Sequence, residues 1–333
     1  MASGNLARRV AVVGAGQMGV NHARVYSQLR GAELVGVLDV DRDRAEKVAE
    51  QFGTTVLPSV QALVDEGAEA VSLCAPSSLH ASLGCELFAA GLHCLVEKPL
   101  ATTEPDALAL IAAAAAAGRQ LVVGHIERFN PAVIQLREIL GDAPEVLAAD
   151  ARRMSAVSGR ITDVDVVSDL MVHDLDIVLD LVRDDIADIT ARGVLRSRAP
   201  GDDYVSALLT FGNGALASLT ASRITQNQIR ELQISTETHL MTVDYSAQEL
   251  LMFRQGRIGG VGDREVESTR YVLDVSTERV FVRRTEPLAA ELAHFLAVVD
   301  GSERALVTGD AALRVLRIVW EIRDQVRGRM SGG

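Results

Sequence analysis

Short apolar runs, many of them β-branched, alternate with helix-length segments over the first part of the chain. These strand-sized runs cover residues 10–13, 34–39, 70–74, 93–96 and 121–123. Strands that are separated by helices along the chain are typical of a parallel sheet with helices on both faces. The pattern therefore predicts that residues 1–124 form a doubly wound α/β domain.

The helix before the last of these strands has clear ends in the sequence. Thr103 and Asp106 resemble a capping box, and Pro105 lies between them in the first turn. The alanine-rich run that follows stops at Gly118, a residue that commonly ends helices. We therefore predict a helix here rather than a linker.

The pattern changes after residue 124, where a helical segment at 166–182 precedes runs of period two. The clearest hairpin joins residues 204–211 and 215–222 through Gly212-Asn213-Gly214, where Asn-Gly can supply the two positive φ angles of a type I′ turn. Consecutive strands without intervening helices predict an antiparallel sheet in a second domain, residues 125–333. Further strand candidates are residues 146–153, 229–235, 240–245, 265–274 and 279–283, and further helices are 132–140, 289–299 and 310–326.

Composition narrows the possible functions. The 333 residues carry 33 Lys plus Arg against 45 Asp plus Glu, which disfavours a broad phosphate-binding surface and hence a nucleic-acid partner. No run approaches the ~18–20 apolar residues of a membrane helix, and the amino-terminal residues lack a signal-peptide pattern. Cys74, Cys85 and Cys94 lack the spacing of a disulfide framework or zinc site. We therefore expect a cytoplasmic protein with reduced cysteines, no membrane span and no metal.

A glycine-rich loop follows the first predicted strand. Gly14, Gly16 and Gly19 form the pattern G-x-G-x-x-G, and a helical segment that includes residues 22–29 follows. The first glycine allows a tight turn, the second lets the backbone approach a pyrophosphate, and the third permits close helix packing; the helix amino terminus attracts the anion. The loop is therefore a candidate dinucleotide site, which also includes Gln17 and Met18.

Asp39 ends the second predicted strand, 20 residues after Gly19. A carboxylate at this position accepts hydrogen bonds from the adenosine ribose and repels a 2′-phosphate, which favours NAD over NADP. Arg42 nearby leaves NADP as the less favoured cofactor. A glycine turn without a ligand is the alternative, and strand, helix and acid together argue against it.

Lys98 follows the predicted strand at 93–96, within Glu97-Lys98-Pro99. This position lies at the carboxyl edge of a parallel sheet, where ligands of such folds bind. A lysine there can hydrogen-bond a reacting hydroxyl and stabilise negative charge on its oxygen. A solvated surface lysine is the alternative, and the tripeptide alone favours it.

The helical segment at 166–182 carries a narrow polar stripe of Asp169, His173, Asp176 and Asp180. At 100° per residue these four side chains lie within about 60° of one another, while apolar residues occupy most of the remaining circumference. The stripe is too narrow for a usual solvent-facing side, so we expect it to line a cavity.

Such a stripe suits the oxidation of an alcohol. Neutral His173 can take the hydroxyl proton while Asp169 orients the imidazole ring. A histidine with a satisfied structural hydrogen bond is the alternative, and metal binding by Asp169, His173 and Asp176 is less favoured because no further His or Cys cluster is found. Asp174 lies on the apolar side of this predicted helix, and its partner is not evident from the sequence.

Polar residues near the predicted domain junction are candidates for binding substrate. Arg128 and Asn130 could bind a polar group, or they could belong to a capped turn into the helix at 132–140. Arg153 and Arg160, with Arg152, suggest an anionic substrate group, since guanidinium pairs bidentately with phosphate. Solvated arginines on a strand edge are an equally ordinary interpretation.

Four motifs together resemble the Gfo/Idh/MocA family: the glycine loop, residues 75–80, Glu97-Lys98-Pro99, and Asp169-x-x-x-His173. The resemblance covers essentially the whole chain. It implies a Rossmann domain, then an α/β domain with an open, mainly antiparallel sheet that binds substrate and mediates assembly into a homodimer or homotetramer. It also implies that Lys98, Asp169 and His173 are catalytic. It further implies that the following residues bind the cofactor: Gly14, Gly16, Gly19, Asp39, Pro76, His80 and Glu97.

Residues 124–131, 169–176 and 221–223 look like the branch of that family that includes UDP-N-acetylglucosamine 3-dehydrogenase. This resemblance implies NAD-dependent oxidation of a sugar hydroxyl, most simply the 3-hydroxyl of a UDP-amino sugar, with Asp176 among the substrate-binding residues. The alternatives are a dehydrogenase of a free sugar or inositol, and a non-catalytic NAD-binding regulator with the same fold.

Overall fold

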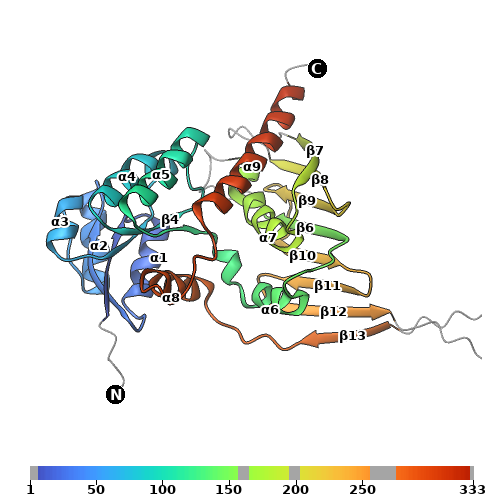
Figure 1. Ribbon diagram of the computed structural model, residues 1–333, viewed down its shortest axis with the longest axis horizontal. Helices are drawn as coiled ribbons and strands as arrows, with labels where there is room; N and C mark the ends of the chain where they lie inside the picture. Colours follow the sequence, from blue (N-terminus) through green and yellow to red (C-terminus); the bar gives the residue numbers. More distant parts are fainter. Residues whose placement is uncertain (1–6, 157–164, 195–202, 256–274, 331–333) are drawn as a thin grey trace, which may run out of the picture. The chain divides into compact units, whose positions relative to one another are not determined.

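Two separate β-sheets organise the chain in the computed structural model (Figure 1). One has five strands and the other has eight. The structure describes residues 7–156, 165–194, 203–255 and 275–330.

The chain divides into two compact units, each built on one sheet. The first unit combines residues 1–129 with 285–318, and the second combines 130–284 with 319–333. The boundary predicted between residues 124 and 125 therefore differs from the observed division, because the chain returns to the first unit after the second sheet.

Helix α8 (Pro287–Val299) gives the physical reason for this return. Its Leu292 and Phe295 are fully buried in the same apolar cluster as Val25 and Tyr26 of α1 (Gln17–Tyr26). The apolar periodicity of residues 289–299 predicts the helix correctly, but periodicity carries no information about which sheet the helix covers.

The first sheet is parallel, with the order β2-β1-β3-β4-β5. This confirms the doubly wound arrangement, and ligands of such sheets bind outside the carboxyl ends of the strands where the order reverses, here between β1 and β3. The strands are β1 (Arg8–Val13), β2 (Ala32–Leu38), β3 (Ala70–Leu73), β4 (His93–Glu97) and β5 (Leu121–Gly124). The other helices of this unit are α2 (Arg42–Phe52), α3 (Val60–Asp65), η1 (Ser77–Leu79), α4 (His80–Ala89), α5 (Glu104–Ala117), η2 (Ile126–Phe129) and the start of α9 (Gly309–Met330).

Helix α5 has the ends that the sequence predicts. The Thr103 side chain accepts a hydrogen bond from the backbone N–H of Asp106, and Gly118 adopts the left-handed conformation after the last turn. The helix is therefore set by local chemistry at both ends.

The second sheet has the order β13-β12-β11-β10-β6-β9-β8-β7 and is antiparallel except for the β6–β9 pair. This confirms a mainly antiparallel sheet. Its strands are β6 (Ala148–Met154), β7 (Ile186–Val194), β8 (Tyr204–Phe211), β9 (Leu216–Ser222), β10 (Ile229–Ser235), β11 (His239–Asp244), β12 (Glu249–Gln255) and β13 (Val275–Val280). The helical elements are α6 (Pro131–Leu140), the π-helical turn η3 (Val167–Met171), α7 (Val172–Val182) and the end of α9.

Two details of the second sheet depart from the sequence-based expectation, and a third cannot be compared. Only Gly214 of the β8–β9 turn has a positive φ, and Phe211 and Ala215 close a three-residue loop, so the turn is not type I′. The strand expected at 279–283 is observed earlier in the chain, as β13 at Val275–Val280. The strand expected at 265–274 falls outside the described residues. The turn differs because two glycines around Asn213 allow a longer loop with one left-handed residue.

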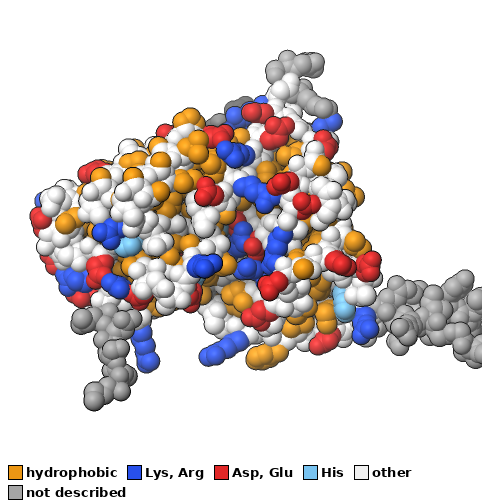
Figure 2. All heavy atoms as spheres, in the orientation of Figure 1, with side chains coloured by type: hydrophobic (Ala, Val, Ile, Leu, Met, Phe, Trp, Pro, Cys, Tyr) orange, Lys and Arg blue, Asp and Glu red, His pale blue; other side chains and the backbone are white. Residues whose placement is uncertain are grey.

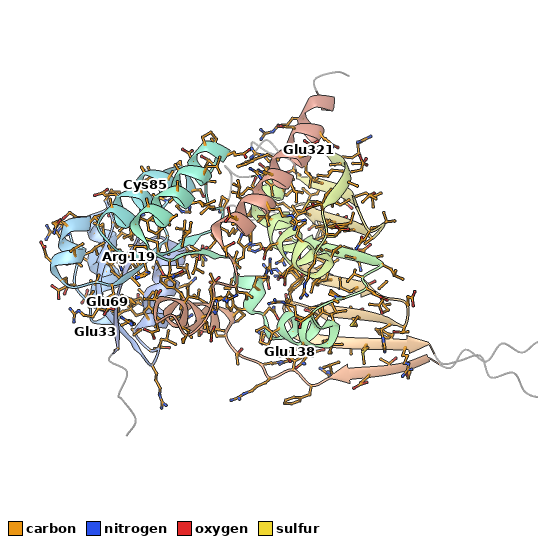
Figure 3. The ribbon with its side chains drawn as sticks, in the orientation of Figure 1. Glu33, Glu69, Cys85, Arg119, Glu138 and Glu321 are labelled. Atoms are coloured by element: carbon orange, nitrogen blue, oxygen red, sulfur yellow. The ribbon has the colours of Figure 1, made fainter. Side chains whose placement is uncertain are left out.

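Exposed ion pairs lie at the amino ends of the first sheet's strands. Arg9 pairs with Glu33 at 2.6 Å and Arg8 pairs with Glu69; both acids are labelled in Figure 3. On the face drawn in Figure 2, acidic and basic side chains are interspersed. Within the described part of the chain, no helix combines the length and the hydrophobicity that crossing a membrane requires.

Candidate functional site

The three glycines of the loop each meet a different steric demand. Gly14 has φ +96°, and a Cβ on it would lie 2.7 Å from the backbone of Cys74 and Ala75 at the end of β3. A Cβ on Gly19 would lie 1.7 Å from the carbonyl oxygen of Gly14, whereas one on Gly16 would meet nothing within 4 Å. The loop is therefore packed against the protein at its two ends and open in its middle.

Helix α1 begins directly after Gly16, and no side chain caps its amino terminus. Gln17 in its first turn is exposed and Met18 is half-buried. The first backbone N–H groups of a helix have no partner within the helix, and together with the helix dipole they favour an anion. The open glycine and the uncapped helix thus fit the pyrophosphate of a dinucleotide.

Asp39 is held by the backbone of two loops. Its carboxylate accepts the N–H of Ala15 at 2.5 Å and the N–H of Asp41 at 2.8 Å. Arg44 approaches the same carboxylate at 3.9 Å, whereas Arg42 turns to Glu46. Arg44, rather than Arg42, is therefore the cation closest to the predicted ribose site.

Val40, which follows Asp39, is fully exposed. An exposed apolar side chain beside a candidate ribose-binding carboxylate offers a surface for a base to lie on. Sequence reasoning missed this residue because a single valine at a strand end carries no local signal.

Glu97 lies at the end of β4, directly before Lys98, and is buried. One carboxylate oxygen is 2.8 Å from Nε2 of His22, and the other accepts the backbone N–H of Lys98 at 3.2 Å. His22, on α1, is fully buried and was not recognised as a site residue from sequence. Lys98 itself is partly exposed, and its peptide bond to Pro99 is cis.

His80 lies on the other side of Lys98 and is also buried. Its Nδ1 is 2.9 Å from the carbonyl oxygen of Pro99, and its Nε2 is 2.9 Å from that of Ala75. Burial lowers the pKa of His80, although both carbonyls and Glu97 oppose this effect. Pro76 is exposed and starts the short helix that leads to His80.

Cys74 lies beside this group of side chains. Burial raises the pKa of its thiol well above the usual range, and Glu97 and Glu291 add to the effect. The thiol therefore stays protonated and is a poor nucleophile. Among the described residues, no group of three or more His, Cys, Asp or Glu side chains could hold a metal ion.

Asp169 lies in the π-helical turn and His173 in the first turn of α7. Asp169 accepts a hydrogen bond from Arg223 at 3.2 Å, and both side chains are largely buried. π-Helical turns are rare in proteins overall, but those that occur are often found at functional sites. Sequence reasoning noticed Arg223 only as part of a family motif.

The residues of the predicted polar stripe have different surroundings. Asp180 pairs with Arg137 at 2.9 Å, while Asp176 is buried and 1% exposed. The expectation assumed a regular 100° per residue, whereas the segment begins with a π-helical turn, and it ignored the rise of about three helical turns between Asp169 and Asp180.

Arg153 and Asp174 form a buried pair. Two guanidinium nitrogens donate to the two carboxylate oxygens at 2.9 Å each, and the guanidinium lies 4.8 Å from the centre of the Tyr245 ring. The pair gives Asp174 the partner that the sequence did not reveal. It also engages the guanidinium of Arg153, which was predicted to bind substrate.

The other predicted substrate residues occupy different surroundings. Asn130 caps α6 through Ala132 and donates to the carbonyl oxygen of Tyr245 at 3.0 Å, which matches the capped-turn alternative. Arg128 is buried within η2, and Arg160 lies outside the described residues.

Each unit therefore brings part of the expected chemistry together. The first unit joins an anion-binding loop, a ribose-type carboxylate and the backbone around Lys98 at the carboxyl edge of its sheet. The second unit holds Asp169 and His173 about one helical turn apart, and the guanidinium of Arg223 donates a hydrogen bond to Asp169. The first set fits a dinucleotide, and the second fits proton transfer.

Comparison with known proteins identifies both units. A family model described as "Oxidoreductase family, NAD-binding Rossmann fold" matches residues 8–125, and one described as "GFO/IDH/MocA C-terminal domain" matches residues 158–240. UDP-N-acetylglucosamine 3-dehydrogenase from Acidithiobacillus ferrooxidans is 33% identical over 96% of this chain and 97% of its own. A solved structure of that enzyme has a TM-score of 0.87 at 32% identity, covering 97% of this chain and 98% of its own. Inositol 2-dehydrogenase from Acidothermus cellulolyticus is 35% identical over 61% of this chain and 62% of its own.

Proposed function

Because this chain belongs to the Gfo/Idh/MocA family of oxidoreductases, we propose that it oxidises the 3-hydroxyl of a UDP-amino sugar such as UDP-N-acetylglucosamine, with NAD as hydride acceptor. One observation carries the choice of substrate: the similarity to the UDP-N-acetylglucosamine 3-dehydrogenase extends over 96% of the chain, whereas that to the inositol 2-dehydrogenase extends over 61%. Oxidation of an inositol or a free sugar is therefore the second candidate.

The surroundings of Asp39 support NAD over NADP. Its carboxylate is largely buried, and a 2′-phosphate would meet it directly. Arg44 is 3.9 Å away and half-exposed, so it offers only weak compensation. A nicotinamide ring bound in this unit supplies the acceptor for the hydride.

The roles of three side chains follow from their chemistry. His173 takes the proton of the substrate hydroxyl, and Asp169 stabilises the imidazolium that forms. Lys98 is the candidate to donate a hydrogen bond to a hydroxyl oxygen as negative charge develops on it. Arg128 and Arg160 remain candidates for binding the anionic part of the substrate, and the guanidinium of Arg153 bonds to Asp174.

The substrate assignment is tested by following NADH absorbance with UDP-N-acetylglucosamine, glucose and myo-inositol, each with NAD or NADP. We expect turnover of the UDP sugar with NAD. Brisk oxidation of myo-inositol or glucose without turnover of the UDP sugar would favour the second candidate. NAD binding without turnover of any substrate would favour a non-catalytic regulator.

The assignment of the base is tested with His173→Asn. Removal of a general base costs about 10² to 10⁴ in rate, so we expect a loss of that size in kcat, with NAD affinity retained. Full activity in this variant would refute the proposed role of His173.

A further inference from the structure

His22 has no role in the proposed chemistry, yet its contacts lead directly to Lys98. The side chain belongs to the sixth residue of α1, and it is fully buried. Its Nε2 contacts one oxygen of the Glu97 carboxylate at 2.8 Å, and the other oxygen accepts the Lys98 N–H at 3.2 Å. A single carboxylate thus connects the helix of the glycine loop to the backbone of Lys98.

The surroundings of His22 define which ring nitrogen carries its proton. Among the described residues, no hydrogen-bond partner lies within reach of Nδ1. A neutral imidazole has one N–H, and an N–H placed at Nδ1 would be buried without an acceptor. The proton therefore resides on Nε2, where it donates to Glu97.

Strand β5 confines the same carboxylate from a third side. A Cβ on Gly124 would lie 3.1 Å from the carboxyl carbon of Glu97 and 3.2 Å from both of its oxygens. Glycine leaves enough room for the carboxylate, and any larger residue would press on it. Glu97 therefore has little freedom to move.

The backbone after Lys98 is held as well. The carbonyl oxygen of Pro99 lies 2.9 Å from Nδ1 of His80. The peptide group before Lys98 thus meets a buried histidine through Glu97, and the peptide group after Pro99 meets another directly. The amine of Lys98 extends from a backbone that is fixed on both sides.

We propose that His22 is a positioning residue for Lys98, acting through the carboxylate of Glu97. The proposal rests on the proposed role of Lys98 in the reaction. It assigns to His22 the task of fixing the direction from which the Lys98 amine reaches the substrate oxygen, a task for which small displacements are costly.

The composition of the chain allows a direct test, because its only lysines are Lys47 and Lys98. In protein labelled with ¹³C,¹⁵N-lysine, NMR resolves one set of Cε–Nζ signals for each, and Lys47→Arg assigns them. Lys47 lies on α2 and is exposed, so it serves as the internal reference. We expect His22→Leu to move the Lys98 signals and leave those of Lys47 unchanged.

Two variants separate positioning from general damage to α1. His22→Gln keeps a donor close to the position of Nε2, so the Lys98 signals should return toward those of the wild type. Tyr26→Phe removes the buried hydrogen bond to Ser72, one turn further along α1, and should leave the Lys98 signals unchanged. Lys98 signals that stay unmoved in His22→Leu, or move equally in Tyr26→Phe, would overturn the proposal.

A double-mutant cycle supplies the kinetic test. We expect His22→Leu to lower kcat about 10²-fold in the wild type, but by less than about threefold when Lys98 is already alanine, because the positioned group is then gone. An equal loss in both backgrounds would show that His22 acts independently of Lys98. Full activity of Lys98→Ala alone would instead refute the proposed function, and the NMR comparison would still decide the positioning.

Gly124→Ala covers the case in which His22→Leu does not fold. This variant keeps the His22 ring and pushes on the Glu97 carboxylate from β5. The Lys98 signals should then move by an amount comparable to that in the His22 variant. If they stay in place, the carboxylate does not control Lys98 and the proposal is wrong.

Discussion

The two units hold their proposed catalytic residues by different kinds of interaction. Around Lys98 in the first unit, buried imidazoles bond to a carboxylate and to backbone carbonyls. Around Asp169 in the second unit, guanidinium groups pair with carboxylates. The second unit thus relies on matched charges, whereas the first relies on the hydrogen bonds of buried imidazoles.

The choice of arginine over lysine fits the second unit. Of 33 basic residues, 31 are arginine. Arginine presents a planar fork of donors that can bind both oxygens of a carboxylate, as Arg153 does with Asp174. A lysine at position 153 would supply the charge without the second bond.

The largest expected effect comes from breaking that buried pair. Arg153→Met removes both guanidinium hydrogen bonds from the buried Asp174 carboxylate, which should lower the free energy of unfolding by about 3–5 kcal/mol. Chemical denaturation measures the loss. The neighbouring Arg152→Met is the control, because Arg152 is exposed to solvent and its pair with Glu231 is worth about 1 kcal/mol or less.

A double variant sharpens this result. Replacing both partners, as Arg153→Met with Asp174→Leu, also removes the buried carboxylate and should recover most of the lost stability. If the double variant is as unstable as the single one, the arginine stabilises the unit through its packing on Tyr245 rather than through the ion pair.

A smaller loss is expected where the π-helical turn begins. The buried carboxylate of Asp165 accepts the N–H groups of Val167 and Ser168 and pairs with Arg323 at 2.9 Å. Asp165→Ala should therefore cost about 2 kcal/mol in urea unfolding. Asp41→Ala, which removes the exposed cap of α2, should cost less; an equal cost would mean that Arg323 contributes nothing.

Arg223 allows the comparison to be tested through activity. Arg223→Gln removes the charge beside Asp169, and we expect kcat to fall on the order of tenfold, the size of one charged hydrogen bond, with little change in Tm. Steady-state kinetics on the substrate that turns over, with a thermal melt of the same sample, measures both quantities. Unchanged kcat would separate Arg223 from the chemistry.

The smallest effect concerns the pH dependence of stability in the first unit. Burial lowers the pKa of His80 below its ordinary 6.5, so below that pH the unfolded chain takes up a proton that the folded chain does not. The stability that His80 contributes is therefore complete above about pH 6.5 and is lost as the pH falls through the lowered folded-state value. His80→Gln should flatten the fall of Tm between pH 7 and 5, and equal slopes in both proteins would contradict this.

The sequence predicted those features that are encoded locally. Gly14, Gly16, Gly19 and Asp39 belong to one strand–loop–helix–strand pattern, and α5 carries both of its end signals between Thr103 and Gly118. The apolar pattern also predicted all five strands of the first sheet and the mainly antiparallel character of the second, although β7 and β12 were not predicted. These elements are defined by residues close together in the chain, which is why periodicity and turn chemistry suffice to find them.

The interactions around the proposed catalytic residues were not accessible in this way. His22 and Glu97 are 75 positions apart, Arg223 and Asp169 are 54 apart, and Arg153 and Asp174 are 21 apart. The local sequence around a histidine or an aspartate on an apolar helix face is the same whether or not that side chain has a partner far along the chain. Only the fold brings each pair together.

The return of the chain to its first unit has a practical meaning for dissecting the protein. Truncating the chain after Phe129 would remove α8, which packs against Val25 and Tyr26, and would expose the apolar face of α1. The ring of Phe129 lies 5.3 Å from that of His294 on α8, so residues 1–129 could instead be spliced to 285–318 through a short linker. Such a fusion, rather than a simple truncation, is the way to obtain the nucleotide-binding half as a stand-alone protein.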